Sequence, residues 1–295
     1  MSAPIGGQAV LEGVMMRGPS NWAVAVRKPN GQIAEVCRPI ESVMKRHWVF
    51  RLPIVRGVIA LGESLAIGFR ALSISANYAA AEEGEEAETE LSRGAIVFVL
   101  LVFKVGPALL VDKLVPVKSG TWFVIIEGAV RVTIFVLYLW LISLLPDLKR
   151  VFQYHAAEHK AINAYEAGEE LTPQTVQRYS LIHPRCGTAF LLWVMVMAIF
   201  VFAFFGRPAF YWLIVTRILL LPVIAGIAYE LIRFAGKHQD NRALMTLLAP
   251  GLWLQRLTTR QPSLDQLEVS IAALQEVLML ERQSSPDAQR VEVMA

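Results

Sequence analysis

The chain has 295 residues, of which 55% are hydrophobic and only 18% are charged. Soluble domains usually carry about 25% charged residues, so this composition, with a mean hydropathy of +0.47, indicates a bilayer protein. The net charge of +3 is too small to indicate nucleic-acid binding, and contact with a membrane surface accounts for the surplus of Lys and Arg. The two cysteines, Cys37 and Cys186, fit either one disulfide or two free thiols.

Residues 1–50 are expected to form a glycine-rich loop and a β-hairpin on the cytoplasmic side. Glycines recur between Pro4 and Pro19, where they permit tight turns. The alternative is a backbone cradle that closes over a ligand. Further on, alternating apolar residues flank the segment Lys28-Pro29-Asn30-Gly31, and Asn-Gly between such runs is a strong hairpin signal.

Residues 51–78 are expected to form an amphipathic helix. Apolar residues recur at helical spacing from Leu52 to Asn77, with charged residues between them. These charges make the helix too polar to span, so we expect it to pack on the cytoplasmic domain or to lie at the membrane surface. The acidic run from Glu82 to Glu90 then predicts a solvated linker over residues 79–93.

Four apolar stretches are each close to the ~20 residues that cross a bilayer as a helix. They place two transmembrane helices in residues 94–146 and two more in residues 189–233, namely Ile96–Val115, Thr121–Leu145, Ala189–Phe205 and Ala209–Ile232. Most Lys and Arg residues outside the spans fall on the side of the termini, and the other side holds only Lys113, Lys118 and Arg207. By the positive-inside rule, both termini and the loop 147–188 are cytoplasmic. The predicted fold class is mainly α: a polytopic helical membrane protein with a small cytoplasmic α/β portion.

Charged residues also occur within the predicted spans. Asp112, Glu127, Arg131 and Arg217 are expected at matching depth, where two acids and two bases can neutralise one another. They are interpreted either as a polar network that locks the helices together or as a polar path for an ion or substrate. Lys104 lies nearest the middle of the membrane, and the sequence gives it no partner at its own depth.

Residues 234–283 predict a cytoplasmic helical tail, and residues 284–295 predict disorder. Ala243–Leu248 predicts a short helix that leads into an interfacial segment. Ser263 and Gln266 then match a capping box, and apolar residues follow at helical spacing. This narrow stripe is suited to a partner helix or to the protein's own cytoplasmic domain, and we favour the second.

The central motif of the cytoplasmic loop reads His155-x-x-Glu158-His159. On a helix the two histidines project from one face, at the spacing that lets two imidazoles bind one Zn²⁺. The order reverses the His-Glu-x-x-His metallopeptidase pattern, in which the histidines hold the metal and the glutamate acts as base. The candidates for a third ligand are Glu166, His183 and Cys186. The structural alternative is that the histidines only fix the fold through hydrogen bonds.

Three segments resemble the DUF1385 family: Gly6–Pro19, His155–Lys160 and His183–Thr188. The resemblance runs over nearly the whole chain up to about Arg260, so the stripe from Ser263 is expected to be its least typical part. It implies an integral membrane protein of unknown function in the bacterial cytoplasmic (inner) membrane. Such proteins are described as predicted metal-dependent enzymes.

Two main functions remain open on these grounds. The first is a metal-dependent enzyme, of a hydrolase type, with a divalent metal such as zinc held by His155 and His159. Glu158 would be the catalytic base or an additional ligand, and His183 or Cys186 would complete the shell. The second is a non-catalytic membrane partner or assembly factor, for example one associated with a protein translocation complex. A transporter is a weaker third option because the spans show no inverted repeat. The expected partners are the lipid bilayer and a membrane protein, not nucleic acid, and the oligomeric state is not set by the sequence.

Overall fold

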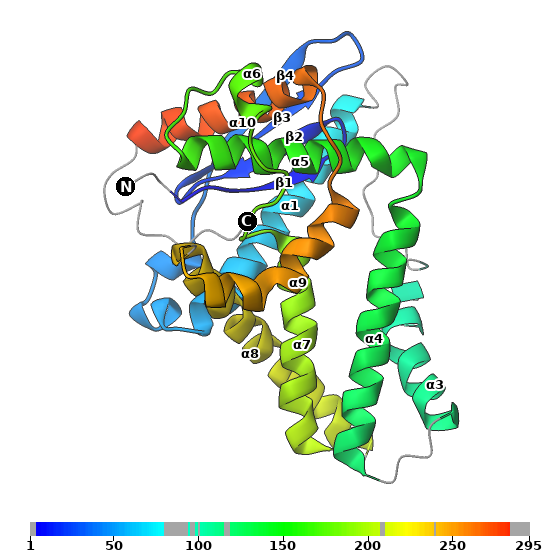
Figure 1. The fold of residues 1–295 in the computed structure, drawn as a ribbon. Coiled ribbons are helices and arrows are strands. Elements are labelled where there is room, and N and C mark those ends of the chain that lie inside the picture. The colour runs from blue at the N-terminus through cyan, green and yellow to red at the C-terminus, as the bar shows by residue number, and fades with distance from the viewer. Residues whose placement is uncertain are drawn as a thin grey trace.

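The computed structural model describes residues 4–79, 94, 98–99, 101–114, 119–206, 210–238 and 240–283. In this part the chain is mainly helical, with a small antiparallel sheet near the N-terminus (Figure 1). The strands are β1 (Gly6–Val10), β2 (Gly13–Arg17), β3 (Asn21–Arg27) and β4 (Ile33–Pro39), followed by the short helices η1 (Val43–Lys45) and η2 (Trp48–Arg51). The remaining helical elements are α1 (Val55–Ala79), η3 (Leu101–Val105), α3 (Gly106–Leu114), α4 (Gly120–Ile142), α5 (Pro146–Glu166), α6 (Pro173–Val176), α7 (Gly187–Phe205), α8 (Phe210–Lys237), α9 (Arg242–Thr258) and α10 (Leu264–Gln283).

The sheet has the simple order β1-β2-β3-β4, and each strand is antiparallel to the next. The predicted hairpin is present: Arg27 pairs with Ile33, and Gly31 at the turn has a φ of 84°, which glycine adopts without steric cost. The glycine-rich segment before it, however, is not a loop as we expected. It forms the first hairpin, β1–β2, whose tight turn puts Glu12 at a φ of 50°.

Both faces of the sheet are covered, so it is the middle of three layers (Figure 1). Side chains alternate between the faces of a strand, and neighbouring residues of one strand therefore enter different cores. Val14 and Ala25 pack with α5 and α10 on one side. Met15 and Val24 pack with Ile67 of α1 on the other. This double burial explains the continuous apolar run Trp22–Val26 in β3, where all five residues are buried.

Helix α10 belongs to the layer that covers the sheet. Its predicted capping box forms: the backbone N of Ser263 donates to Gln266 Oε1 at 3.0 Å, and the backbone N of Gln266 donates to Ser263 Oγ at 3.4 Å. Leu267, Ile271 and Leu274 are all buried. The apolar stripe therefore packs on the protein's own domain, the option that we favoured.

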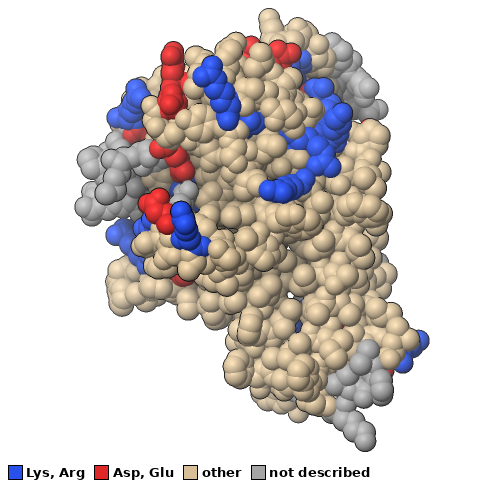
Figure 2. Space-filling view, viewed as in Figure 1, with Lys and Arg blue, Asp and Glu red and all other residues tan. Residues whose placement is uncertain are grey.

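The helices below the sheet layers form an apolar bundle. Among the described residues, four helices are long and apolar enough to cross a membrane: α1, α4, α7 and the part Val215–Lys237 of α8. Figure 2 shows charged side chains gathered around the sheet layers, whereas the lower helices are almost free of charge on this face except at their tip. Large apolar side chains are exposed there, among them Trp122 at 60%, Phe200 at 62% and Ile218 at 67%. An apolar surface of this extent is typical of contact with lipid or another protein.

Helix α1 differs from its prediction. We expected it to be too polar to span, yet its length and composition are sufficient. Its C-terminal half packs on the sheet, as described above, and its N-terminal half packs on α8. A Cβ on Gly57 would lie 2.8 Å from Tyr229 Cδ1, and Arg56 forms an ion pair with Glu230 at 2.6 Å. Much of the apolar surface of α1 is thus used inside the protein.

The first predicted span, Ile96–Val115, lies only partly within the described residues. There η3 and α3 run along α4, and the Phe103 and Tyr138 rings meet edge to face with centroids 5.5 Å apart. The Lys104 side chain, the acidic linker around Glu82–Glu90 and the tail 284–295 lie outside the described part of the chain.

The predicted charge network within the bundle forms around Glu127, which is only 2% exposed. Its carboxylate pairs with Arg131 one turn further along α4, and Arg217 of α8 approaches it to 3.9 Å. Arg131 Nε also donates to the carbonyl of Phe103 at 3.0 Å. These contacts tie α4 to α8 and η3, which supports the interpretation as a helix-locking network. Asp112, the fourth predicted member, lies on α3 beside α4.

Candidate metal centre

Helix α5 carries the central motif along the edge of the sheet, where the sheet layers meet the bundle (Figure 1). Its sequence suits a helix start, with Pro146 in the first turn and Asp147 beside the helix N-terminus. The strand β1 approaches it very closely. A Cβ on Gly7 would lie 2.6 Å from Glu158 Cγ, so only glycine at this position leaves room for the Glu158 side chain.

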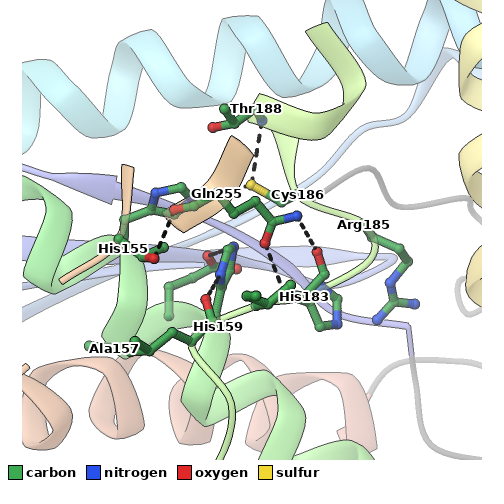
Figure 3. A network of polar contacts seen from close by, with 12 residues as sticks. His155, Ala157, His159, His183, Arg185, Cys186, Thr188 and Gln255 are labelled. Carbon is green, nitrogen blue, oxygen red and sulfur yellow. Dashed lines mark hydrogen bonds and ion pairs between the residues drawn. The ribbon is translucent and has the colours of Figure 1, made fainter. Parts of the chain in front are cut away.

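The two motif histidines are held in the same way, each by a backbone carbonyl (Figure 3). His155 Nδ1 lies 2.8 Å from the carbonyl oxygen of Thr258, and His159 Nδ1 lies 2.6 Å from that of Leu181. Because a carbonyl oxygen can only accept, each Nδ1 carries a proton and donates it. When such a ring is neutral, its Nε2 atom carries a lone pair that can bind a metal, and a metal that binds a protonated ring takes the place of the Nε2 proton. Metal-ligating histidines typically donate their other ring N–H in this manner.

Cys186 completes a group of three with these histidines. Its Sγ lies 3.3 Å from His155 Nε2, and the ligand atoms of His155, His159 and Cys186 all lie within 4.8 Å of one another. Cys186 is also the N-cap of α7, where the backbone N of Thr188 donates to Sγ at 3.4 Å (Figure 3). A helix N-terminus favours negative charge.

The charges of this group reinforce one another. Burial alone would raise the pKa of the Cys186 thiol, but positive charge on His155 and His159 holds that pKa well below its usual value. Burial alone would lower the pKa of His159, but the negative charges of Cys186 and Glu158 raise it to about 9. The site therefore stabilises a thiolate, the form of cysteine that binds metals.

His159 Nε2 is buried and has no hydrogen-bond partner among the described residues. The nearest carboxylate oxygen, Glu158 Oε2, is 3.6 Å away. A buried polar atom without a partner is uncommon and calls for an explanation. A tetrahedral ion at about 2.0–2.3 Å from N and S donors separates its ligand atoms by roughly 3.3–3.7 Å. The distance of 3.3 Å between His155 Nε2 and Cys186 Sγ lies in this range, and the ligand atom of His159 lies within 4.8 Å of both, so the donor set fits a divalent ion once His159 moves closer.

The structure places two other predicted ligands outside this group. The ring of His183 is buried with its centroid 5.9 Å from that of His159, and its Nε2 lies 3.5 Å from Glu166 Oε2. Glu166 also pairs with Arg185. Burial opposes ionisation of Glu166, but His183 and Arg185 outweigh it and lower the pKa of the carboxyl. For His183, in contrast, burial itself is the main cause of a lowered pKa. These residues form a separate polar cluster.

Gln255, which the sequence analysis did not select, holds the loop before α7 (Figure 3). Its Oε1 accepts from the backbone N of His183 at 3.0 Å, and its Nε2 donates to the His183 carbonyl at 2.8 Å. Helix α9 is one continuous helix, not the short helix and interfacial segment that we predicted. Because α9 continues to Thr258, its last turn supplies both this anchor and the carbonyl that orients His155.

A cavity of about 440 Å³ opens onto the group. This volume lies within the ~300–1,000 Å³ that is usual for small-molecule sites. The polar part of its lining includes His155, Glu158, His159, Cys186, Arg17 and Ser64. The candidate ligands are therefore accessible to a small molecule.

A family model described as "Protein of unknown function (DUF1385)" matches residues 52–280. The chain belongs to the DUF1385 family. Uncharacterized protein YqhQ of Bacillus subtilis (strain 168) is 34% identical over 294 residues, which cover 94% of this chain and 92% of YqhQ. No solved structure matches the chain. None of these comparisons names an activity.

The DUF1385 match extends past Arg260 through most of α10, so the family resemblance is longer than we expected. It contains all the predicted site residues, from His155 to Cys186, and the anchor Gln255. The glycine hairpin with Gly7 lies before its first residue. Function must therefore be argued from the site itself.

Proposed function

We propose that this DUF1385 protein is a multi-pass membrane protein that carries a metal-dependent hydrolase site on its cytoplasmic face. His155, His159 and Cys186 would hold one divalent ion. Zinc is the first candidate because it takes nitrogen and sulfur donors, and catalytic zinc sites keep three protein ligands and an open position. One observation carries the proposal: carbonyls hold both Nδ1 atoms, and one ring nitrogen of each histidine lies within 4.8 Å of the other and of Cys186 Sγ.

The residues around the group are suited to hydrolysis. A bound divalent ion would supply Lewis acidity and an activated water at this position. Glu158 lines the cavity next to His159 and is 2% exposed. Its carboxylate can take a proton from the attacking water and deliver it to the leaving group. The carbonyls of Thr258 and Leu181 keep the imidazoles in place through this step.

A metal-free cysteine hydrolase is the second candidate. A thiolate at a helix N-terminus beside a histidine is a common nucleophile, and Cys186 beside His155 has this arrangement. Such a mechanism needs only one histidine as base, however. It leaves the buried Nε2 of His159 without a hydrogen-bond partner among the described residues, whereas a metal would provide one.

A cytoplasmic position of the site is supported by the distribution of Lys and Arg residues and by the helix ends that line the cavity. Lys and Arg residues concentrate at the sheet layers, which the positive-inside rule places in the cytoplasm (Figure 2). The C-terminal end of α4 and the N-terminal end of α7 both line the cavity. The site would then lie at the boundary between the bilayer and the cytoplasm, in the bacterial inner membrane.

Metal content tests the proposal directly. The detergent-purified protein, prepared without chelators, should contain close to one zinc, iron or manganese ion per chain by mass spectrometry. His155→Ala and His159→Ala should each lose the ion and keep a cooperative thermal transition. His238→Ala is the matched control, because His238 is exposed and outside the group. A protein without metal would overturn the proposal and favour the membrane-partner hypothesis.

The thiolate ligand can be tested by spectroscopy. Cobalt(II) bound by a thiolate shows a strong ligand-to-metal charge-transfer absorption. This band should disappear in Cys186→Ser and remain in Cys37→Ser, since Cys37 lies on β4 and bonds to the carbonyl of Trp22. A band that survives Cys186→Ser would exclude Cys186 as a ligand. A wild-type protein that binds no metal and loses its hydrolytic activity when Cys186 is alkylated would instead favour the cysteine mechanism.

A further inference from the structure

The cavity at the candidate metal centre has a second, apolar wall. That wall contains Leu61 and Leu65 of α1, Leu139 and Ile142 of α4, and Leu191 of α7. All three helices are long and apolar enough to cross a membrane. The side chains that close the cavity therefore belong to the same helices that would meet the lipid.

The apolar wall reaches the outside of the protein. Leu65 is 54% exposed and Leu191 is 50% exposed, although both line the cavity. One turn beyond Leu65, Phe69 is 55% exposed and extends the apolar surface along α1. An opening bordered by exposed leucine and phenylalanine side chains is unfavourable in water and favourable in hydrocarbon. Leu65 of α1 and Leu191 of α7 thus belong to the cavity lining and to the outer surface at the same time.

The polar end of the cavity is rich in hydrogen-bond donors. Arg17 is 1% exposed and reaches Ser64 Oγ at 2.6 Å and Glu63 Oε2 at 2.7 Å. Its Nε is buried and has no partner among the described residues. Because Glu63 balances the charge of Arg17, this end is suited to the oxygens of an ester or phosphoester more than to a free anion.

We propose that the site takes a membrane lipid. One acyl chain would lie along the leucine wall, and the ester or phosphoester linkage of the head would lie beside His155, His159 and Cys186. The inference rests on the proposed function for the chemistry at the head. It adds the substrate class and the route, which is lateral entry from the cytoplasmic leaflet.

A peptide is the competing ligand. Gly7, Gln8 and Ala9 are consecutive in β1 and all line the cavity, so the cavity borders the edge of the sheet, where an extended peptide could add as a strand. The apolar wall opposes this ligand. Leucine side chains from three helices cannot pair with peptide N–H and C=O groups, and leaving such groups unpaired is unfavourable. An acyl chain has no polar group to satisfy.

Photo-crosslinking in nanodiscs tests the lipid. The full chain is reconstituted with phosphatidylglycerol that carries a diazirine in one acyl chain, and labelled peptides are mapped by mass spectrometry. Label is expected on the cavity segments around Leu139 and Leu191. Leu65→Trp and Leu191→Trp should reduce that label roughly tenfold, or about 1.4 kcal/mol in binding free energy. Phe200→Trp is the matched control, because Phe200 is exposed on α7 and lies outside the cavity lining.

The outcomes separate this inference from the proposed function. The His155→Ala/His159→Ala variant should lose metal and still show cavity label, since the leucine wall is unchanged. If the wild type contains metal but the label is found only on the outer faces of the helices, the lipid proposal is refuted and the metal site is retained. Equal label in the tryptophan variants and their control would overturn it too. A photoreactive extended peptide that labels Gly7–Ala9, with no lipid label in the cavity, would assign the site to peptides.

Discussion

Replacing Gln255 with leucine is expected to weaken the fold and the candidate metal centre together. The Gln255 side chain is 0% exposed, and both of its polar atoms bond to the backbone of His183, at 3.0 and 2.8 Å. Leucine has a similar volume and no polar atom. The N–H and C=O of His183 would both lose their partner in a buried place. Each such loss costs about 1–3 kcal/mol, so the pair predicts a destabilisation of about 2–6 kcal/mol.

Loss of the Gln255 side chain should also weaken metal binding, because the loop that it anchors leads directly to Cys186. Cys186 comes three residues after His183, so a loosened loop misplaces the thiolate relative to His155. Loss of a residue that orients a metal ligand typically weakens metal affinity by about 10–100-fold. Thermal unfolding in detergent and competition with a zinc chelator measure the two effects. Gln275→Leu is the control, because Gln275 is exposed on α10.

Two results would contradict this reasoning. A Gln255→Leu protein with the thermal transition of the wild type would show that the loop does not depend on this side chain. A destabilised protein with unchanged zinc affinity would show that Gln255 anchors the loop but that this loop does not determine the position of Cys186. Gln255→Glu refines the test, since it keeps an acceptor for the His183 N–H and sets an oxygen against the carbonyl. Its stability should fall between those of the other two proteins.

Three further predictions concern other parts of the fold. Gly7→Ala places a methyl group 2.6 Å from Glu158 Cγ and should lower stability by about 1–3 kcal/mol, measured by thermal unfolding. Glu127→Leu leaves Arg131 without its buried partner and should cost about 3–5 kcal/mol, whereas the double variant with Arg131→Leu should recover much of that loss. Glu166→Gln should be destabilising at pH 7. Because folding lowers the Glu166 pKa below 4.5, its stabilisation is present above that pH and fades as the pH falls further, so the difference measured by chemical denaturation should shrink at acidic pH.

Local sequence signals predicted the elements whose cause is local. Asn30-Gly31 gave the β3–β4 hairpin, and Ser263 with Gln266 gave the start of α10. The long apolar runs predicted α4, α7 and α8 because the length of a membrane helix follows from the thickness of a bilayer. Helical spacing also placed His155 and His159 on one face, and the structure brings Cys186 to them.

The remaining features depend on contacts between distant segments. The glycine-rich segment could not be recognised as a hairpin because its strands are specified by packing against α5 and α10, not by an alternating pattern. The composition of α1 reads as amphipathic, yet its neighbours in the fold are a sheet and another helix. The carbonyls of Leu181 and Thr258 orient the histidines through the backbone, which every residue type possesses. No side-chain pattern could have identified them.

The position of the site explains why one chain combines a sheet domain with an apolar bundle. The candidate metal ligands come from α5, which packs on the sheet, and from the N-cap of α7, which is long enough to cross a membrane. In the proposed function, water and protons would reach Glu158 from the polar layers, and a lipid would enter past the leucine wall. Hydrolysis of a membrane lipid requires both access routes to end at the same atoms. This fold would bring them together, because Cys186 caps α7 directly beside the histidines of α5.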